Sequence, residues 1–264
     1  MREIAISISN RNKNATPIQT IDAVKAAGFQ KVFVQWYNES WEISQQEQLD
    51  YIRASGLAVL FAHLGYYREI NCIWQDTNAG DSLVEKYIVD IDSCAKNAIP
   101  MVILHPVYGM SAPPCSEIGL RRLQKLAAYA RVCGIKIAVE NVFLKGYLEY
   151  ILAHLSDDNL GVCFDSGHSH YYFDGDFDFS FCTDRVFAVH LHDNDKSGDQ
   201  HLLPFDGTIN WAPLVRSLQN SGYSGPVTLE TAYQKEYLAT DALSFYQKAR
   251  ERGHKLADLF DSIS

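Results

Sequence analysis

Histidine and carboxylate side chains stand at the ends of a series of short apolar segments in this sequence. The segments and their last residues are VLFAH (His63), MVILH (His105), KIAVE (Glu140), LGVCFD (Asp165), VFAVH (His190) and PVTLE (Glu230). Such side chains are costly to bury unless they are paired or bound to a metal ion. The pattern predicts a ring of strands whose carboxyl ends converge on a cation.

The residue types at these ends indicate which metal ions would be held. Glu140, Asp165, His190 and Glu230 offer three carboxylates and one imidazole, and no thiolate. This mixture favours Mn²⁺, Zn²⁺, Co²⁺ or Fe²⁺ over Ca²⁺.

Further ligand types lie close to these ends along the chain. His168 lies in DSGHSH, and Asp199 and His201 lie in DQH, while His63 and His105 could complete a further position. Nine such side chains exceed what one ion can use, so we expect one to three ions. His170 and His192 adjoin proposed ligands, and we expect them to orient those ligands.

Strand-like and helix-like segments alternate from one end of the chain to the other. The expected strands are Glu3–Ser7, Lys31–Gln35, Leu57–His63, Met101–His105, Lys136–Glu140, Leu160–Asp165, Arg185–His190 and Pro226–Glu230. The clearest amphipathic segments are Ile18–Ala27, Gln45–Ser55, Leu83–Asn97, Ile118–Cys133, Trp211–Ser221 and Asp241–Phe260. This alternation, with near-continuous apolar strands, predicts a parallel sheet buried on both faces. Eight repeats without a linker predict one α/β domain over residues 1–264, a (β/α)8 TIM barrel.

The composition and net charge of the chain limit the kinds of partner that it is expected to bind. The chain has 264 residues, 47% of them hydrophobic, and a net charge of -9, so its bulk field does not attract polyanions or anionic membranes. Nucleic acid is therefore a disfavoured partner. The Arg121-Arg122 pair is interpreted as part of a solvated helix face rather than as a phosphate-binding site. The six cysteines show no CxxC spacing, and no segment is long and apolar enough to span a membrane, so we expect a cytoplasmic protein. An exposed helix face could pair subunits, so a homo-oligomer stays open.

The strand-end motifs resemble one known superfamily in their order along the whole chain. They are IAVEN, GVCFDSGHSH, VHLHDNDKSGDQH, PFDGTINW and VTLET. They are similar to those of the xylose-isomerase-like TIM barrels, which join sugar isomerases and epimerases to endonuclease IV, the AP endonuclease family 2. For the epimerases the resemblance implies four metal ligands at Glu140, Asp165, His190 and Glu230, with His168 helping to hold substrate. For endonuclease IV it implies three zinc ions on all nine ligand residues named above.

The sequence departs from both branches of the superfamily. Endonuclease IV typically has D-T-C-H and H-L-N-D where this chain has glycine at Gly167 and histidine at His192. Where endonuclease IV has D-R-H, this chain has DQH, without the arginine. Tyr66, in contrast, agrees with a position at which that family has a tyrosine. The epimerases often have an arginine at the position of Lys196. Lysine and arginine side chains do not bind a substrate oxygen in equivalent ways.

Two enzyme hypotheses and one binding hypothesis follow. The first is a sugar or sugar-phosphate isomerase or epimerase, in which Glu140 and Glu230 move a proton on opposite faces of a substrate chelated by the metal. His168 and Lys196, with His105 as a further candidate, would bind hydroxyl groups, and four aromatic residues would wall the pocket. These are Trp36, Tyr37, Tyr66 and Tyr108. The second hypothesis is a multi-zinc phosphodiester or phosphomonoester hydrolase of the endonuclease IV type, and the third is a non-catalytic barrel that binds metal or sugar.

Overall fold

The computed structural model describes residues 2–8, 15–36, 42–65 and 68–262, in which eight strands and eight α-helices alternate. The strands are β1 (Ile4–Ile8), β2 (Lys31–Gln35), β3 (Ala58–His63), β4 (Met101–Leu104), β5 (Lys136–Glu140), β6 (Leu160–Asp165), β7 (Val186–His190) and β8 (Val227–Leu229). The helices are α1 (Pro17–Ala26), α2 (Gln45–Ala54), α3 (Asn78–Lys96), α4 (Glu117–Val132), α5 (Tyr147–His154), α6 (Ser166–Tyr172), α7 (Trp211–Asn220) and α8 (Ala242–Ser262). Every predicted strand is present, shifted by at most a few residues.

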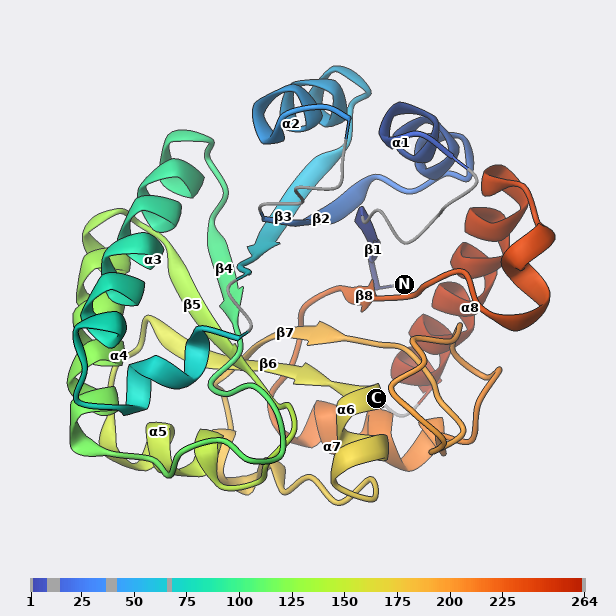
Figure 1. The fold of residues 1–264 in the computed structure, drawn as a ribbon. Helices are drawn as coiled ribbons and strands as arrows, with labels where there is room; N and C mark the ends of the chain where they lie inside the picture. Colours follow the sequence, from blue (N-terminus) through green and yellow to red (C-terminus); the bar gives the residue numbers. More distant parts are fainter. Residues whose placement is uncertain (1, 9–14, 37–41, 66–67, 263–264) are drawn as a thin grey trace.

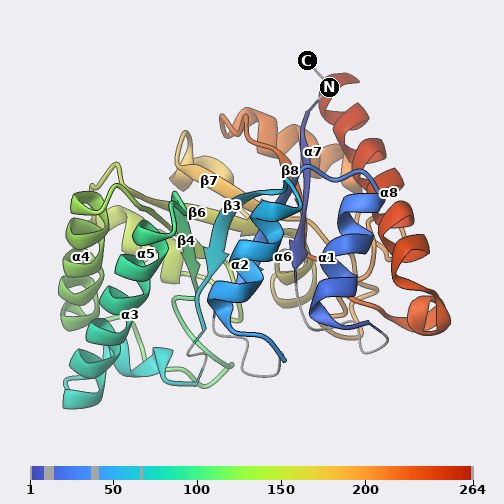
Figure 2. The ribbon, with the colours of Figure 1, turned by 90° about the horizontal axis from the view of Figure 1, so that it is seen from above.

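The strands form one parallel sheet that curls into a barrel. Their order is β7-β6-β5-β4-β3-β2-β1-β8, so each strand pairs with its neighbour in sequence and β1 also pairs with β8. The remaining seam is joined just beyond β7, where the Leu191 N–H donates to the Thr228 carbonyl at 2.8 Å. Figure 1 looks into this ring, with the helices outside it and α1 beside α8, and Figure 2 shows the helices running alongside the strands. The predicted (β/α)8 TIM barrel is confirmed.

The helices begin where the sequence supplies capping residues. Thr16 and Ser44 each accept a hydrogen bond from the backbone three residues later, and Gln19 and Glu47 reach back to complete two capping boxes before α1 and α2. Two short helices, α5 and α6, are additions to the amphipathic segments named from the sequence. Helix α6 begins directly after β6 because the Asp165 carboxylate accepts from the His168 N–H at 2.6 Å.

Apolar side chains fill the interior of the barrel and form the floor beneath the strand ends. This inner cluster consists of Phe33, Phe61, Ile103, Ala138, Cys163 and Ala188. The ring of Phe33 stacks on that of His190, with centroids 4.9 Å apart. The barrel is therefore a packed core below, and polar side chains occupy only its upper end.

One expectation for the outer surface is wrong. Arg121 is exposed as expected, but the Arg122 side chain is only 5% exposed. Its guanidinium donates to the Asp81 carboxylate and to the backbone carbonyls of a 3-10 helix, η1 (Ile70–Trp74), and the segment after it. The sequence pattern missed this because the carbonyls that bury Arg122 come from about fifty residues away in the chain.

Among the described residues, no helix combines the length and the apolar character needed to cross a membrane. The six cysteines, all within the described residues, are free.

Candidate metal centre

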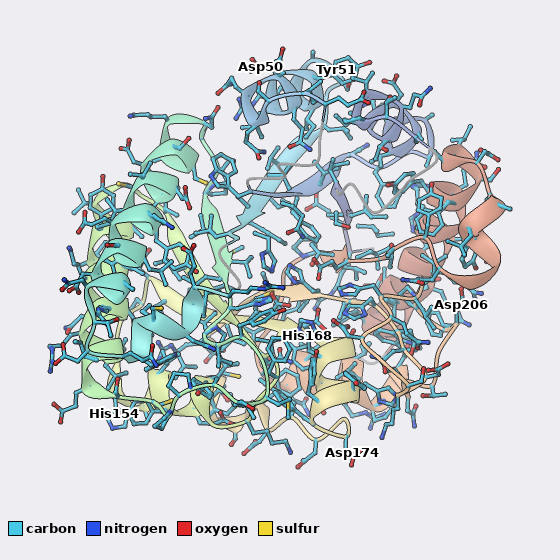
Figure 3. The ribbon with its side chains drawn as sticks, in the orientation of Figure 1. Asp50, Tyr51, His154, His168, Asp174 and Asp206 are labelled. Carbon is cyan, nitrogen blue, oxygen red and sulfur yellow. The ribbon has the colours of Figure 1, made fainter. Side chains whose placement is uncertain are left out.

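The predicted ligand residues meet at the carboxyl ends of the strands. His63, Glu140, Asp165 and His190 are the last residues of β3, β5, β6 and β7, and Glu230 follows β8 directly. His105 follows β4, and His168 lies in α6, where Figure 3 places it toward the centre of the ring. Asp199 and His201 lie in the loop that follows β7. Eight of the nine side chains are at most 10% exposed, and that of Asp199 is 24% exposed.

Glu140 lies at the centre of this cluster and is fully buried. Its Oε2 lies 2.9 Å from the Nε2 of His63 and 3.3 Å from the Nε2 of His105. Its Oε1 lies 3.2 Å from the Nδ1 of His168 and 3.2 Å from the Nδ1 of His190. The two carboxylate oxygens therefore face two different sets of imidazoles.

Five groups of potential ligands, some of them overlapping, result among the described residues, and in each of them the ligand atoms lie within 4.8 Å of one another. Three of them together contain all nine predicted ligand residues: His63, His105 and Glu140; then Glu140, Asp165, His190 and Glu230; and then His168, His192, Asp199 and His201. The other two are His63, His190 and Glu230, and Glu140, Cys163 and His190. The first two groups share Glu140. The second group consists of the four residues expected to touch one ion, so these four side chains do lie together. His192, which the sequence suggested only as an orienting partner, is part of the third group.

The orientation of the imidazole rings suits metal binding. The rings of His63, His168 and His201 each place Nδ1 within 2.9 to 3.0 Å of a backbone carbonyl oxygen. A ring that donates its Nδ1–H in this way keeps the lone pair on Nε2. That nitrogen faces Glu140 in His63 and faces Asp199 in His168 and His201.

The buried polar atoms also fit a cation. Within the described part of the chain, Glu140 Oε1 and both ring nitrogens of His190 have no hydrogen-bond partner, although both side chains are fully buried. Buried polar atoms are costly when unpaired, so an additional partner is expected at this point. The hard oxygens and imidazole nitrogens around it are ligands that Zn²⁺ and Mn²⁺ accept.

Electrostatic coupling within the cluster is strong. Burial alone raises the pKa of Glu140, but the charges of His190 and His105 outweigh it and hold that pKa well below its usual range. Burial likewise raises the pKa of Glu230, but His190 and His201 outweigh it and lower that pKa to about 2. Burial lowers the pKa of His168, but the carboxylates of Asp165 and Asp199 raise it well above its ordinary value. Glu140 and Glu230 thus stay ionised and attract positive charge, whether protons or a metal ion.

Several residues that hold the ligands escaped the sequence analysis. The Asn141 side chain, just beyond β5, donates to the Asp165 carbonyl at 2.9 Å and accepts from the Asp165 N–H at 2.6 Å. The Gln35 amide donates to Glu230 Oε1 at 2.9 Å. Both are polar residues at strand ends, next to a ligand in the sequence or across the barrel, which is the signal that could have identified them.

The loop carrying Asp199 and His201 is anchored by one buried carboxylate that the sequence analysis also missed. Asp193 is fully buried and accepts hydrogen bonds from the backbone N–H groups of Phe205 and Ile209 and from the indole of Trp211, at 3.0 to 3.1 Å. His201 and Phe205 have positive φ angles, which are uncommon outside glycine. Asp193 therefore fixes a backbone path that the loop alone would not favour.

The residues predicted to bind substrate do not all lie in one described place. Trp36 is buried directly after β2, and Tyr37 and Tyr66 lie outside the described residues. The Lys196 Nζ lies 2.8 Å from the Asp174 carboxylate, and Figure 3 places Asp174 at the outer edge of the molecule. Lys196 therefore pairs with an exposed carboxylate on the surface.

Tyr108 is 38% exposed and begins a row of aromatic rings that leads back to the cluster. Its ring centroid lies 5.3 Å from that of Phe143, which lies 5.0 Å from that of Tyr172. The ring of Tyr172 lies 5.7 Å from that of His168. Phe143 and Tyr172, which the sequence analysis did not select, thus connect Tyr108 to the third ligand group.

The fold and this cluster define a β/α barrel with a buried set of metal-ligand side chains at its carboxyl end. Residues 21–249 match the family model described as xylose isomerase-like TIM barrel, and the chain belongs to that family.

Two curated relatives illustrate the range of sequence similarity. The uncharacterized protein y4fM of Sinorhizobium fredii is 31% identical over 150 residues, which are 54% of this chain and 47% of that protein. A protein named probable endonuclease 4, from Mycoplasma capricolum, is 27% identical over 187 residues, which are 60% of this chain and 63% of that protein. The matched regions thus span about half to two thirds of these relatives.

Solved protein structures resemble this fold over nearly the full length of the chain. An L-ribulose 3-epimerase matches with a TM-score of 0.76 and 16% identity, covering 100% of this chain and 96% of that one. The IolI protein, crystallised with a bound zinc atom, matches with a TM-score of 0.77 and 16% identity, covering 100% and 99%. At this identity the likeness concerns the fold.

Proposed function

We propose that this protein is a metal-dependent hydrolase of small phosphoesters, with two ion positions that share Glu140. The observation that carries the proposal is the division of the Glu140 carboxylate, whose two oxygens each lie within 3.3 Å of two different imidazole nitrogens. A carboxylate placed in this way is suited to bridge two cations. The relatives named probable endonuclease 4 support the same chemical class.

The residues of the chain would divide the work as follows. His63 and His105 would complete one ion position, and Asp165, His190 and Glu230 the other. Such ions, when bound, lower the pKa of water and neutralise charge that develops on a phosphoryl group. The Gln35 amide holds one Glu230 oxygen at 2.9 Å, which leaves the other oxygen directed at His190, 3.4 Å away. The packed apolar floor beneath His190 excludes water from below the cluster.

A small substrate is proposed rather than duplex DNA because the net charge of -9 opposes a polyanion. The row of Tyr108, Phe143 and Tyr172 offers an apolar surface beside the cluster for the rest of a small ester. Duplex DNA with an abasic site is nevertheless a substrate to test, because of the relatives named probable endonuclease 4.

A sugar or sugar-phosphate isomerase or epimerase is the second candidate. It is favoured by the group of Glu140, Asp165, His190 and Glu230 and by the full-length likeness to an L-ribulose 3-epimerase. In that reaction Glu140 and Glu230 would exchange a proton with a substrate carbon. The complete burial of Glu140, with both oxygens near imidazoles, opposes this role and places the reaction second.

The two candidates are separated by paired assays on protein loaded with zinc or manganese. The first assay measures hydrolysis of aryl phosphomonoesters, aryl phosphodiesters and abasic duplex DNA. The second measures uptake of deuterium from heavy water by a panel of ketoses and ketose phosphates. We expect hydrolysis without carbon-bound deuterium; deuterium uptake without hydrolysis would replace the proposal by the isomerase.

Glu230→Gln provides the matched variant in both assays. Loss of one ligand charge should lower turnover by about a thousandfold, equivalent to about 4 kcal/mol of transition-state stabilisation, while the barrel remains folded by circular dichroism. Full activity in this variant would remove Glu230 from the mechanism.

A further inference from the structure

The third ligand group contains a histidine that is buried and incompletely paired. His192 is fully buried, and its Nε2 lies 3.0 Å from Oδ1 and 3.1 Å from Oδ2 of Asp165. Its Nδ1 has no hydrogen-bond partner among the described residues. The ring stacks on that of His201 with centroids 3.9 Å apart and planes 11° apart. A buried ring nitrogen without a partner is costly, so the ring is expected to meet something beyond Asp165.

The place of the His192 ring depends on the absence of a side chain at Gly167. A Cβ atom at Gly167 would lie 1.9 Å from Cε1 and 2.3 Å from Nδ1 of His192, far inside van der Waals contact. Gly167 is not among the residues with positive φ, so the space it leaves, and not its backbone freedom, is what the site uses. The two departures from the endonuclease IV pattern, Gly167 and His192, therefore explain one another.

We propose that His192 is a fourth protein ligand that closes the ion position formed by His168, Asp199 and His201. One potential ligand atom from each of these four residues lies within 4.8 Å of the others. Zinc held by four protein ligands is typical of structural sites, whereas catalytic sites keep a position open for water or substrate. The ion in the third group would therefore stabilise the loop after β7, and the opening for water or substrate would lie at the position of His63, His105 and Glu140, which has three protein ligands. This inference rests on the proposed function for its catalytic consequence only.

The simplest competing role for His192 is to orient Asp165 by a hydrogen bond. That role predicts no change in the third ion when His192 is replaced by a residue that still donates to Asp165. Asparagine keeps an N–H donor but cannot supply an imidazole ligand, so His192→Asn separates the two roles. His170→Asn is the matched control, because His170 lies in the same region, bonds to the Thr208 hydroxyl at 2.8 Å and is outside the group.

The test counts ions and observes their coordination, independently of activity. The wild-type protein and both variants are loaded with zinc, dialysed against a chelator and analysed for metal per chain. We expect His192→Asn to keep one chelator-resistant ion fewer per chain than wild type and His170→Asn. With cobalt in place of zinc, the visible absorption of the bound Co²⁺ should change in position and intensity in His192→Asn, as water replaces the imidazole, and should be unchanged in His170→Asn.

Gly167→Ala gives a second route to the same result. The added methyl group must displace the His192 ring, so this variant should also lose the resistant ion. Combining it with His192→Asn should add no further loss, because the ring it would displace is gone. This keeps the test decisive if His192→Asn alone fails to fold.

Retention of the resistant ion and of the cobalt spectrum in a folded His192→Asn variant would overturn the proposal, and so would a wild-type protein with no resistant ion. A resistant ion lost on removal of His192, in a protein that hydrolyses no phosphoester, would leave the His192 assignment standing and refute the proposed function. The two failures are therefore distinguishable.

Discussion

The most informative single residue is Glu140, because its position separates two kinds of chemistry. A carboxylate that transfers a proton to a substrate carbon needs an oxygen that faces substrate. Glu140 is fully buried, and imidazole nitrogens surround both of its oxygens. This arrangement favours a bridging ligand over an acid or base.

Glu140→Gln tests this bridging role. The amide nitrogen of glutamine cannot bind a cation, so the variant should bind at least one ion fewer per chain and lose about a thousandfold or more in hydrolysis. Elemental analysis and steady-state kinetics measure the two effects. Glu149→Gln, at an exposed glutamate that caps α5, should change neither. An unchanged ion count in Glu140→Gln would contradict the bridging role.

The titrating groups of the cluster predict how the metal-free protein responds to pH. The lowered pKa values of Glu140 and Glu230 give stability that is present above about 4.5 and lost as the pH falls through their folded values. The raised pKa values of His168, His190 and His192 give stability that is present below about 6.5 and lost as the pH rises through their folded values. Burial lowers the pKa of His105. This one histidine therefore favours the folded protein at higher pH, in opposition to His168, His190 and His192.

We therefore expect the melting temperature of the metal-free protein to be highest between about pH 4.5 and 6.5 and to fall at higher pH. Added zinc should reverse the fall, because the ion replaces the lost protons as the partner of the carboxylates. Thermal melts from pH 4 to 9 with chelator or with zinc measure both effects. A metal-free protein that becomes steadily more stable above pH 7 would contradict this account.

Among the elements, the link between β5 and β6 places two of the ligands. The Asn141 side chain makes two hydrogen bonds to the backbone of Asp165, and all of these groups are buried. Asn141→Ala would leave two backbone groups unpaired and should cost about 3 kcal/mol in the free energy of unfolding.

Asn71→Ala is the control, since Asn71 makes the same pair of backbone bonds to Tyr108 at 2.8 and 2.9 Å, but in a more exposed place. Water can replace those bonds, so the cost there should stay below about 1 kcal/mol. Urea unfolding of both variants measures the difference. Equal costs would show that burial of the β5–β6 link is not what matters.

The strands were predictable to within a few residues because each is a short apolar segment, and in most of them a polar side chain ends the strand or follows it directly. The convergence of the candidate ligands at these ends was predictable for the same reason. Gln35 and Asn141 were not identified as positioning residues, and His192 was expected only to orient a ligand, because the contacts of these side chains join different strands and no local pattern contains them. The ion pair of Lys196 involves Asp174, which is twenty-two residues away in the sequence, so the local pattern did not indicate it.

For the molecule as a whole, Arg122 joins α4 to α3 and to the segment around η1. Its buried guanidinium satisfies carbonyls that would otherwise lie unpaired. Arg122→Ala should therefore cost about 3 to 5 kcal/mol of unfolding free energy, because it leaves buried polar groups without a partner.

Arg121→Ala, at the adjacent exposed position with a surface ion pair to Glu117, should change stability by no more than about 0.5 kcal/mol. Denaturant titration of both variants measures the comparison. A small effect of Arg122→Ala would mean that water readily takes the place of the guanidinium.

The most direct measurement of the whole account is anomalous X-ray scattering at the zinc edge from crystals of the zinc-loaded protein. It should show three peaks per chain: one beside His63 and His105, a second beside Asp165 and Glu230, and a third beside Asp199 and His201, with the first two separated by Glu140. A single peak within the group of Glu140, Asp165, His190 and Glu230, or no peak, would contradict it.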